Sequence, residues 1–87
     1  MTIAIRVEKD EDQILAVYAT IREGQVARTV EIVEGACYAD EDANGNLLGV
    51  EMLAPGKLNI YVPAVAEHYP DEEVEKALNL ALENVRL

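Results

Sequence analysis

Residues 40–51 read DEDANGNLLGVE, and this stretch has two interpretations that lead to different folds. The first is an EF-hand calcium loop, which supplies oxygen ligands at alternate positions, a glycine near its centre and a carboxylate at its end. The second is a β-hairpin, because the dipeptide Asn44-Gly45 tolerates the positive φ angles of tight turns. Counted from the first aspartate, the calcium pattern is matched throughout, by Asp40, Asp42, Asn44, Gly45, the carbonyl of Asn46, a water beside Leu48, and Glu51.

The residues on either side of the loop favour the hairpin. An EF-hand requires one helix before its loop and another after it. Residues 29–33 form a largely β-branched run that favours a strand, and Pro55-Gly56 would end an outgoing helix within a turn. We therefore predict that residues 40–45 form the tip of a hairpin. The alternative is a weak divalent-cation (calcium) binding domain that uses Asp40, Asp42, Asn44 and Glu51.

Hydrophobic residues alternate along most of the first two thirds of the chain, which is the pattern of half-buried strands. Tight connections between successive strands imply an antiparallel meander. Leu58 to Val62 is compatible with a sixth strand or with an extended arm, and residues 55–70 are expected to form an irregular connection. The predicted strands are residues 2–8, 14–22, 26–33, 36–40 and 47–53.

A change of period predicts a C-terminal helix over residues 71–86. Asp71 is the predicted N-cap, and Glu72 and Glu73 suit the positive end of the helix dipole. The sequence therefore predicts an α+β fold, an antiparallel β-meander of five to six strands with a C-terminal α-helix packed on one face, in a single domain of residues 1–87. The apolar stripe that predicts the helix contains Val74, Ala77, Leu78, Ala81, Leu82 and Val85.

Composition limits the partners of such a domain. The 87 residues include 17 acidic and 7 basic side chains, and the formal net charge is −10. This charge repels phosphate groups, so we expect no direct contact with nucleic acid and no membrane binding. It favours a basic protein partner, or self-association as a homodimer. A single cysteine, no visible signal peptide and no apolar run of about 18 residues predict a cytoplasmic protein.

Part of the chain resembles a known family. The resemblance is carried by Val26–Ile32, Gly35, Asp40-Glu41-Asp42, Gly45 and Leu47–Leu53. These residues resemble the YuzE-like family of uncharacterised small bacterial proteins, whose members carry an Asp-x-Asp-x-x-Gly turn and then a Gly-Ile-Glu-Ile-Leu type of strand. The resemblance covers residues 3–54, with one extra residue before the turn glycine, Val7-Glu8 in place of a Tyr-Asp pair, and Asp12–Leu15 retaining part of an Asp-x-Leu-Tyr signature. It implies a small β-meander domain of unknown function. Because some members are encoded beside toxin-like genes, it also implies an antitoxin-like role.

Other reactive side chains form no recognisable catalytic set. Cys37 and His68 would need to meet in a pocket to act as a dyad, and Cys37 lies in an alternating strand typical of a buried thiol. The acidic clusters of residues 8–12 and 71–75 are expected to be a solvated turn and a helix start. We therefore predict a non-catalytic protein-interaction module without a cofactor, with calcium binding as the alternative and a small enzyme as the least favoured interpretation. Four aromatic residues would supply either an interaction surface or core volume, namely Tyr18, Tyr38, Tyr61 and Tyr69.

Overall fold

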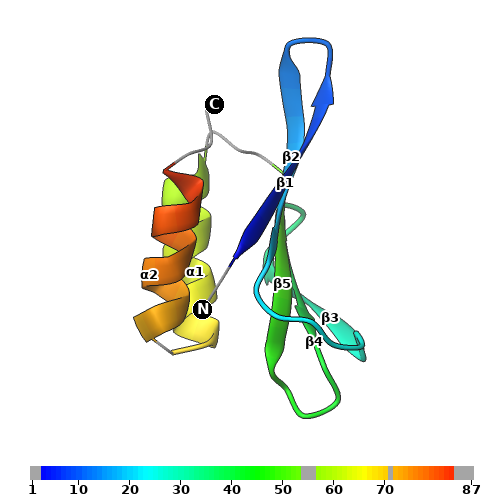
Figure 1. Ribbon diagram of the computed structural model, residues 1–87, viewed down its shortest axis with the longest axis vertical. Coiled ribbons are helices and arrows are strands. Elements are labelled where there is room, and N and C mark those ends of the chain that lie inside the picture. The colour runs from blue at the N-terminus through cyan, green and yellow to red at the C-terminus, as the bar shows by residue number, and fades with distance from the viewer. Residues whose placement is uncertain (1–2, 54–56, 71, 84–87) are drawn as a thin grey trace.

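The computed structural model describes residues 3–53, 57–70 and 72–83, apart from the side chains of residues 58, 72 and 73. Five antiparallel strands form one sheet, and two helices pack side by side against one of its faces (Figure 1). The α+β class predicted from the sequence is therefore confirmed. The elements are β1 Ala4–Asp10, β2 Gln13–Thr20, β3 Arg28–Val33, β4 Cys37–Glu41, β5 Leu47–Met52, α1 Leu58–His68 and α2 Glu72–Leu82.

The sheet order is β1-β2-β5-β4-β3, so the strands do not form one continuous meander. β1 and β2 form a hairpin, and β3, β4 and β5 form a meander, but β2 pairs with β5 instead of β3. The connection after β2 crosses the ends of β5 and β4. Along it, the amide of Ile21 donates to the carbonyl of Leu48, and the amide of Ala27 donates to that of Glu41. Gly24 permits the close passage, because a Cβ there would lie 2.8 Å from Leu48 Cδ2.

The distribution of hydrophobic residues explains why β5 lies in the middle of the sheet. Every residue of β5 is buried except Glu51, which is partly buried. The two outer strands differ from β5, because their apolar side chains alternate with charged or polar ones. These include Arg6 and Glu8 on β1 and Glu31 on β3. Charged side chains on an edge strand hinder pairing with a second sheet. The strand order thus pairs the most apolar strand on both sides and leaves the charged strands at the edges.

One face of the sheet forms the core with the two helices. On this face successive rows of side chains are apolar, and they are buried together with residues of α1 and α2. Figure 1 shows both helices on this side of the sheet. Among the residues described, no helix or strand packs on the opposite face. The buried core contains Val17, Ala19, Ile21, Cys37, Ala39, Leu47, Val50 and Met52 from the sheet side, and Tyr61, Val62, Val65, Val74 and Leu78 from the helices.

Residues 58–68 form a helix, so the sixth strand or extended arm expected at Leu58 to Val62 was wrong. The irregular connection expected over residues 55–70 was wrong where α1 stands, and residues 55 and 56 lie outside the described residues. The short alternation of apolar residues imitated a strand. Pro63 lies inside this helix, where a proline removes a backbone donor. Tyr61 and Val65 are one helical turn apart and are both buried against the sheet. This burial outweighs the local penalty of the proline.

The predicted C-terminal helix is confirmed in its described part, which is α2. Val74 and Leu78 are buried in the core, and Leu82 packs against the core one turn later. Their spacing is the apolar stripe expected from the sequence. The predicted N-cap Asp71 and the predicted last turn with Val85 lie outside the described residues.

Candidate functional site

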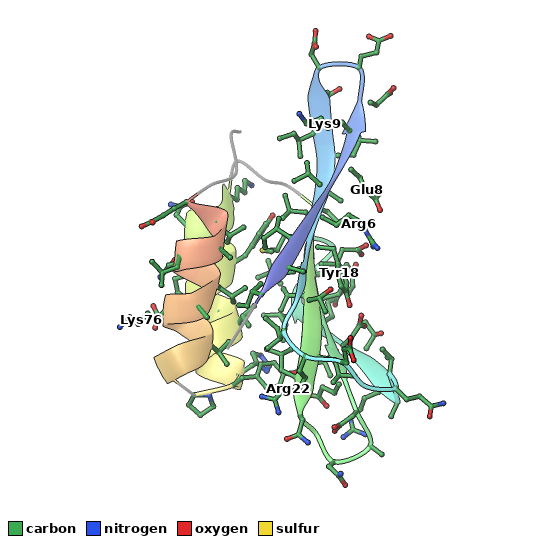
Figure 2. All side chains as sticks on the ribbon, in the orientation of Figure 1. Arg6, Glu8, Lys9, Tyr18, Arg22 and Lys76 are labelled. Atoms are coloured by element: carbon green, nitrogen blue, oxygen red, sulfur yellow. The ribbon has the colours of Figure 1, made fainter. Side chains whose placement is uncertain are left out.

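The uncovered face of the sheet is polar and gathers side chains from every strand (Figure 2). The strand register places Arg6, Tyr18, Glu51, Tyr38 and Glu31 in one row, each paired with the next. The adjacent row contains Ala4, Thr20, Gly49, Asp40 and Thr29. We call these two rows, together with Glu8, the open face. Arg6, Glu8 and Tyr18 are seen in Figure 2 on the side of the sheet away from the helices.

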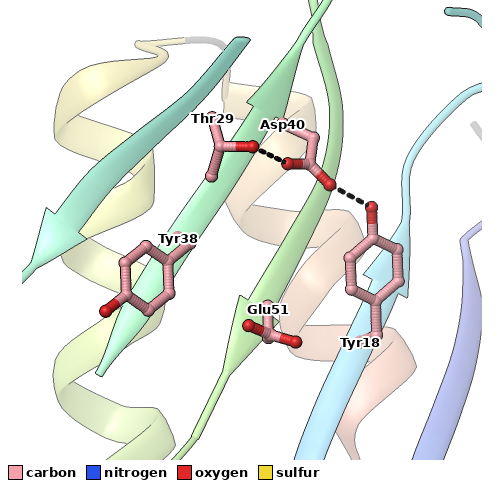
Figure 3. Close-up of a pocket in the computed structure, with 5 residues that line it drawn as sticks. All are labelled: Tyr18, Thr29, Tyr38, Asp40 and Glu51. Carbon is pink, nitrogen blue, oxygen red and sulfur yellow. Dashed lines mark hydrogen bonds between the residues drawn. The ribbon is translucent and has the colours of Figure 1, made fainter. Parts of the chain in front are cut away.

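Asp40 is held in place by two hydroxyl groups. The Tyr18 hydroxyl donates to Asp40 Oδ2 at 2.7 Å, and the Thr29 hydroxyl donates to Asp40 Oδ1, also at 2.7 Å (Figure 3). Burial raises the pKa of Tyr18 to about 12, and the hydrogen bond to Asp40 contributes in the same direction. The tyrosine therefore remains protonated at neutral pH. Asp40 is an acceptor whose orientation is fixed from both sides.

Gly49 allows Tyr18 to reach Asp40 across the intervening strand β5. Gly49 is buried, and it is paired with Thr20 on one side and with Asp40 on the other. A Cβ on this residue would lie 2.7 Å from Cζ and 3.0 Å from Cε1 of Tyr18. Carbon atoms normally pack at roughly 3.5–4.0 Å, so a side chain at position 49 would displace the tyrosine ring. The ring thus lies directly on the glycine.

The open face has a depression of about 340 Å³ between its two tyrosines, lined by Tyr18, Thr29, Tyr38, Asp40 and Glu51 (Figure 3). Glu51 lies between the rings, because it is paired with Tyr18 on β2 and with Tyr38 on β4. Burial raises the pKa of Tyr38, and the negative charges of Glu31 and Glu51 raise it further. Aromatic faces and carboxylates both attract cations, so the depression suits a positively charged group.

The turn that follows β4 is a hairpin turn built on Asp42. Its Oδ1 accepts hydrogen bonds from the amides of Asn44 and Asn46, each at 2.9 Å, and its Oδ2 accepts one from the Asn46 side chain at 3.0 Å. The Asn46 side chain, with the Asn46 and Asn44 amides, holds the pKa of Asp42 below its usual value. Gly45 has a φ of 83°, which favours glycine. The predicted hairpin is therefore confirmed, with its turn at residues 42–46, while Asp40 and Glu41 still belong to β4.

The candidate calcium ligands occupy different parts of this hairpin. Asp40 and Glu51 line the same depression on the open face, whereas both oxygens of Asp42 are turned into the backbone loop. Asn44 is exposed in the turn. Strands flank the stretch where an EF-hand needs helices. In the part of the chain that the structure describes, no three His, Cys, Asp or Glu side chains are grouped to hold a metal ion.

Glu41 stands between the two aspartates and joins the helix layer to the sheet. Tyr69, directly after α1, donates to Glu41 Oε2, and Arg28 Nε donates to Glu41 Oε1 at 2.7 Å. The hydrogen bond from Tyr69, and then that from Arg28, lower the pKa of Glu41. Burial and the bond to Glu41 raise the pKa of Tyr69. Arg28 is therefore engaged by Glu41, and its charge is not directed to the open face.

Cys37 and His68 have very different surroundings. Cys37 is fully buried in the core, and burial raises the pKa of its thiol to about 11. His68 is exposed in the last turn of α1, with its ring centroid 6.3 Å from that of Tyr69. A thiol that is fully buried and protonated at neutral pH is poorly suited to nucleophilic attack. The geometry supports the structural interpretation of Cys37.

Sequence reasoning grouped Asp40 with Glu51 only as candidate calcium ligands, and it did not bring them together with Tyr18 and Tyr38. Their convergence depends on β2 pairing with β5, and an ordered meander would instead have placed β3 beside β2. One signal was available in the sequence. A glycine within a strand often marks a place where another group approaches closely, and Gly49 has that position.

No family model, no curated protein and no solved structure matches this chain. The resemblance to the YuzE-like family therefore stays a prediction. Within the described ranges, no helix is both long enough and apolar enough to cross a membrane.

Proposed function

We propose that this chain is a non-catalytic protein-interaction module that binds a basic segment of a partner protein on the open face. One observation carries the proposal: no described helix or strand covers one face of the sheet, and this face presents two tyrosines among carboxylates. Asp40, Glu51 and Glu31 contribute negative charge there, while Arg6 is the one cationic side chain in the two rows that define the face. Tyrosine is enriched at protein interfaces because it combines a large apolar ring with a polar group.

Charge favours a different protein over a second copy as the partner. The net charge of −10 attracts a basic protein and accelerates its association, particularly at low ionic strength. Two copies of this chain would bring like charges together at the same face. An antitoxin-like role, in which the chain covers the basic surface of a toxic partner in the bacterial cytoplasm, is the most specific form of the proposal. The resemblance of residues 3–54 to the YuzE-like family supports that form by association.

The test compares two variants with the same net charge. The open-face variant carries Glu31→Gln and Glu51→Gln, and the control variant carries Glu67→Gln and Glu75→Gln at exposed positions of the helices. Each tagged protein is used to capture partners from its host, and the captured protein is then purified and its affinity measured by calorimetry at low and high salt. The proposal expects a basic partner that is retained by the wild type and the control but weakened by the open-face changes and by salt.

Three results would contradict the proposal. The first is a partner that binds the open-face variant and the control variant equally, because binding would then use another surface. The second is a chain that recovers no partner and elutes as a monomer in size-exclusion chromatography with light scattering. A third result, a homodimer of the wild type that dissociates in the open-face variant, would also contradict the basic partner. The occupant of the open face would then be a second copy of the chain.

A further inference from the structure

The row of paired residues across the open face has a regular pattern of charge and aromaticity. From β1 to β3 it reads Arg6, Tyr18, Glu51, Tyr38 and Glu31, and each residue is the direct cross-strand neighbour of the next. Side chains in such pairs have Cβ atoms about 4.5–5.5 Å apart, which is close enough for direct contact. Each tyrosine of the row is therefore flanked by charged groups on both sides.

The two tyrosines differ in whether a cation accompanies them. The guanidinium of Arg6 lies over the ring of Tyr18, with Cζ 5.2 Å from the ring centroid. This is a cation–π contact formed within the chain itself. Tyr38 is flanked by Glu51 on one side and Glu31 on the other, and neither position of the row beside it supplies a positive charge. In the described part of the chain, Glu51 receives no side-chain hydrogen bond, whereas Glu31 accepts one at Oε2 from the amide of Gly35 at 3.1 Å.

We propose that Tyr38 is the base of a subsite for one arginine side chain of the partner, with the guanidinium lying on the ring and paired with Glu31 and Glu51. This inference rests on the proposed function and adds the residue type that the partner inserts. A guanidinium on the ring of Tyr38 would repeat the contact that Arg6 already forms with Tyr18, on the other side of Glu51.

The geometry favours arginine over lysine. A guanidinium is planar, stacks on aromatic rings and donates in several directions in its plane, so it can contact a ring and two carboxylates together. An ammonium group is compact and more strongly hydrated, and it gains less from an exposed ring. The depression beside Tyr38, about 340 Å³ in volume, also has room for the aliphatic part of the side chain.

The subsite can be tested without knowing the partner by using three small probes. These are N-acetyl-arginine amide, its uncharged isostere N-acetyl-citrulline amide, and N-acetyl-lysine amide, each titrated into isotopically labelled protein and followed by NMR. We expect arginine amide to cause saturable shifts at Tyr38 and at the Glu51 amide, and to bind more tightly than the other two. Tyr38→Leu should weaken its binding about two- to five-fold, the range for an exposed cation–π contact. Tyr38→Phe, which keeps the ring, should retain it.

Glu51→Gln should weaken arginine amide binding as well, whereas its charge-matched control Glu67→Gln should not. Circular dichroism and a thermal melt establish that each variant is folded before it is titrated. The inference is overturned if arginine amide gives no saturable shift up to its solubility limit, if the shifts lie on the helices, or if Tyr38→Leu binds as tightly as the wild type. Lysine amide binding as tightly as arginine amide also overturns it.

Binding of the captured basic partner to two variants distinguishes a failure of the arginine subsite from a failure of the proposed function on which it rests. A partner that binds Tyr38→Leu normally but is lost from the double variant Glu31→Gln, Glu51→Gln contradicts the subsite and leaves the docking surface supported. A partner that binds the double variant normally contradicts both.

Discussion

Replacing Gly49 by alanine should disrupt the open face, because the added carbon overlaps the ring of Tyr18. It would lie 2.7 Å from Cζ and 3.0 Å from Cε1 of that ring and closer still to the hydroxyl. The backbone of β5 is held between β2 and β4, so the ring must move instead. Its movement breaks the hydrogen bond that Tyr18 donates to Asp40.

Two contributions set the size of the effect. Overpacking destabilises by about 1–3 kcal/mol, and a lost hydrogen bond to a charged group costs about 1.5–3 kcal/mol. Tyr18 is only partly buried, so its ring can swing outward and water can replace part of the bond. We therefore expect Gly49→Ala to lower the free energy of unfolding by about 2 kcal/mol. For a domain of this size the corresponding fall in Tm is about 8–16 °C.

A double-mutant cycle measured by urea denaturation and circular dichroism tests this reasoning. In the Tyr18→Ala background the ring is absent, and Gly49→Ala should be neutral or stabilising by up to about 1 kcal/mol, because alanine restricts the unfolded chain. Tyr18→Phe is the control that keeps the ring and removes only the hydrogen bond, so Gly49→Ala should remain destabilising there. If Gly49→Ala has the same effect in the wild type and in Tyr18→Ala, within about 0.5 kcal/mol, the two residues are independent and the reasoning is refuted.

Three further predictions concern the hairpin and the helix layer. Tyr69→Phe should destabilise by about 1 kcal/mol at neutral pH, because Glu41 loses a donor. The hydrogen bonds from Tyr69 and then from Arg28 lower the pKa of Glu41. The stabilisation is therefore complete above the ordinary pKa of glutamate and is lost as the pH falls through the lowered pKa. In thermal melts over a series of pH values, the difference in Tm between Tyr69→Phe and the wild type should disappear in acid. Asp42→Ala should lower Tm more than Asn44→Ala, because Asp42 accepts three hydrogen bonds of the turn, and equal melting temperatures would contradict this. Calcium and magnesium should leave Tm unchanged in calorimetric scans, because the donors of Asn44 and Asn46 already occupy both oxygens of Asp42. A rise in Tm that is specific to calcium and abolished by Asp42→Ala would restore the calcium-binding alternative.

The sequence predicted the positions of the strands because runs of alternating or β-branched apolar residues are separated by turn signals. Residues 47–53, for example, contain the whole of β5, and the turn signal of Asn44-Gly45 correctly connected it to β4. The order of the strands depends on longer-range packing, because a local pattern states which face is buried but not which strand is the neighbour. α1 was missed for a different reason, because Leu58 to Val62 alternates over too few residues to distinguish a strand from one face of a helix.

The candidate site was predictable residue by residue but not as an arrangement. Tyr18 and Asp40 are 22 positions apart and meet across a third strand. Their contact requires Gly49 between them, and a glycine within a strand indicates a close approach without identifying the group that approaches. Arg6 was equally inconspicuous, since an arginine on an edge strand is usually solvated, and its position over Tyr18 follows from the pairing of β1 with β2.

The consecutive residues Asp40, Glu41 and Asp42 match a calcium loop in sequence, but their side chains have three different sets of partners in the structure. A calcium loop needs the first and third carboxylates to turn toward one ion. In a strand, neighbouring side chains point to opposite faces. Asp40 therefore lies on the open face, and Glu41 lies on the other face, where it accepts a hydrogen bond from Tyr69 of the helix layer. The strand ends at Glu41, and Asp42 is taken up by the turn. Glu41 is bonded to Arg28, Asp42 to its own turn, and Asp40 to Tyr18 and Thr29. Within the described residues, Glu51 is therefore the carboxylate of this hairpin that lines the depression without a side-chain hydrogen bond.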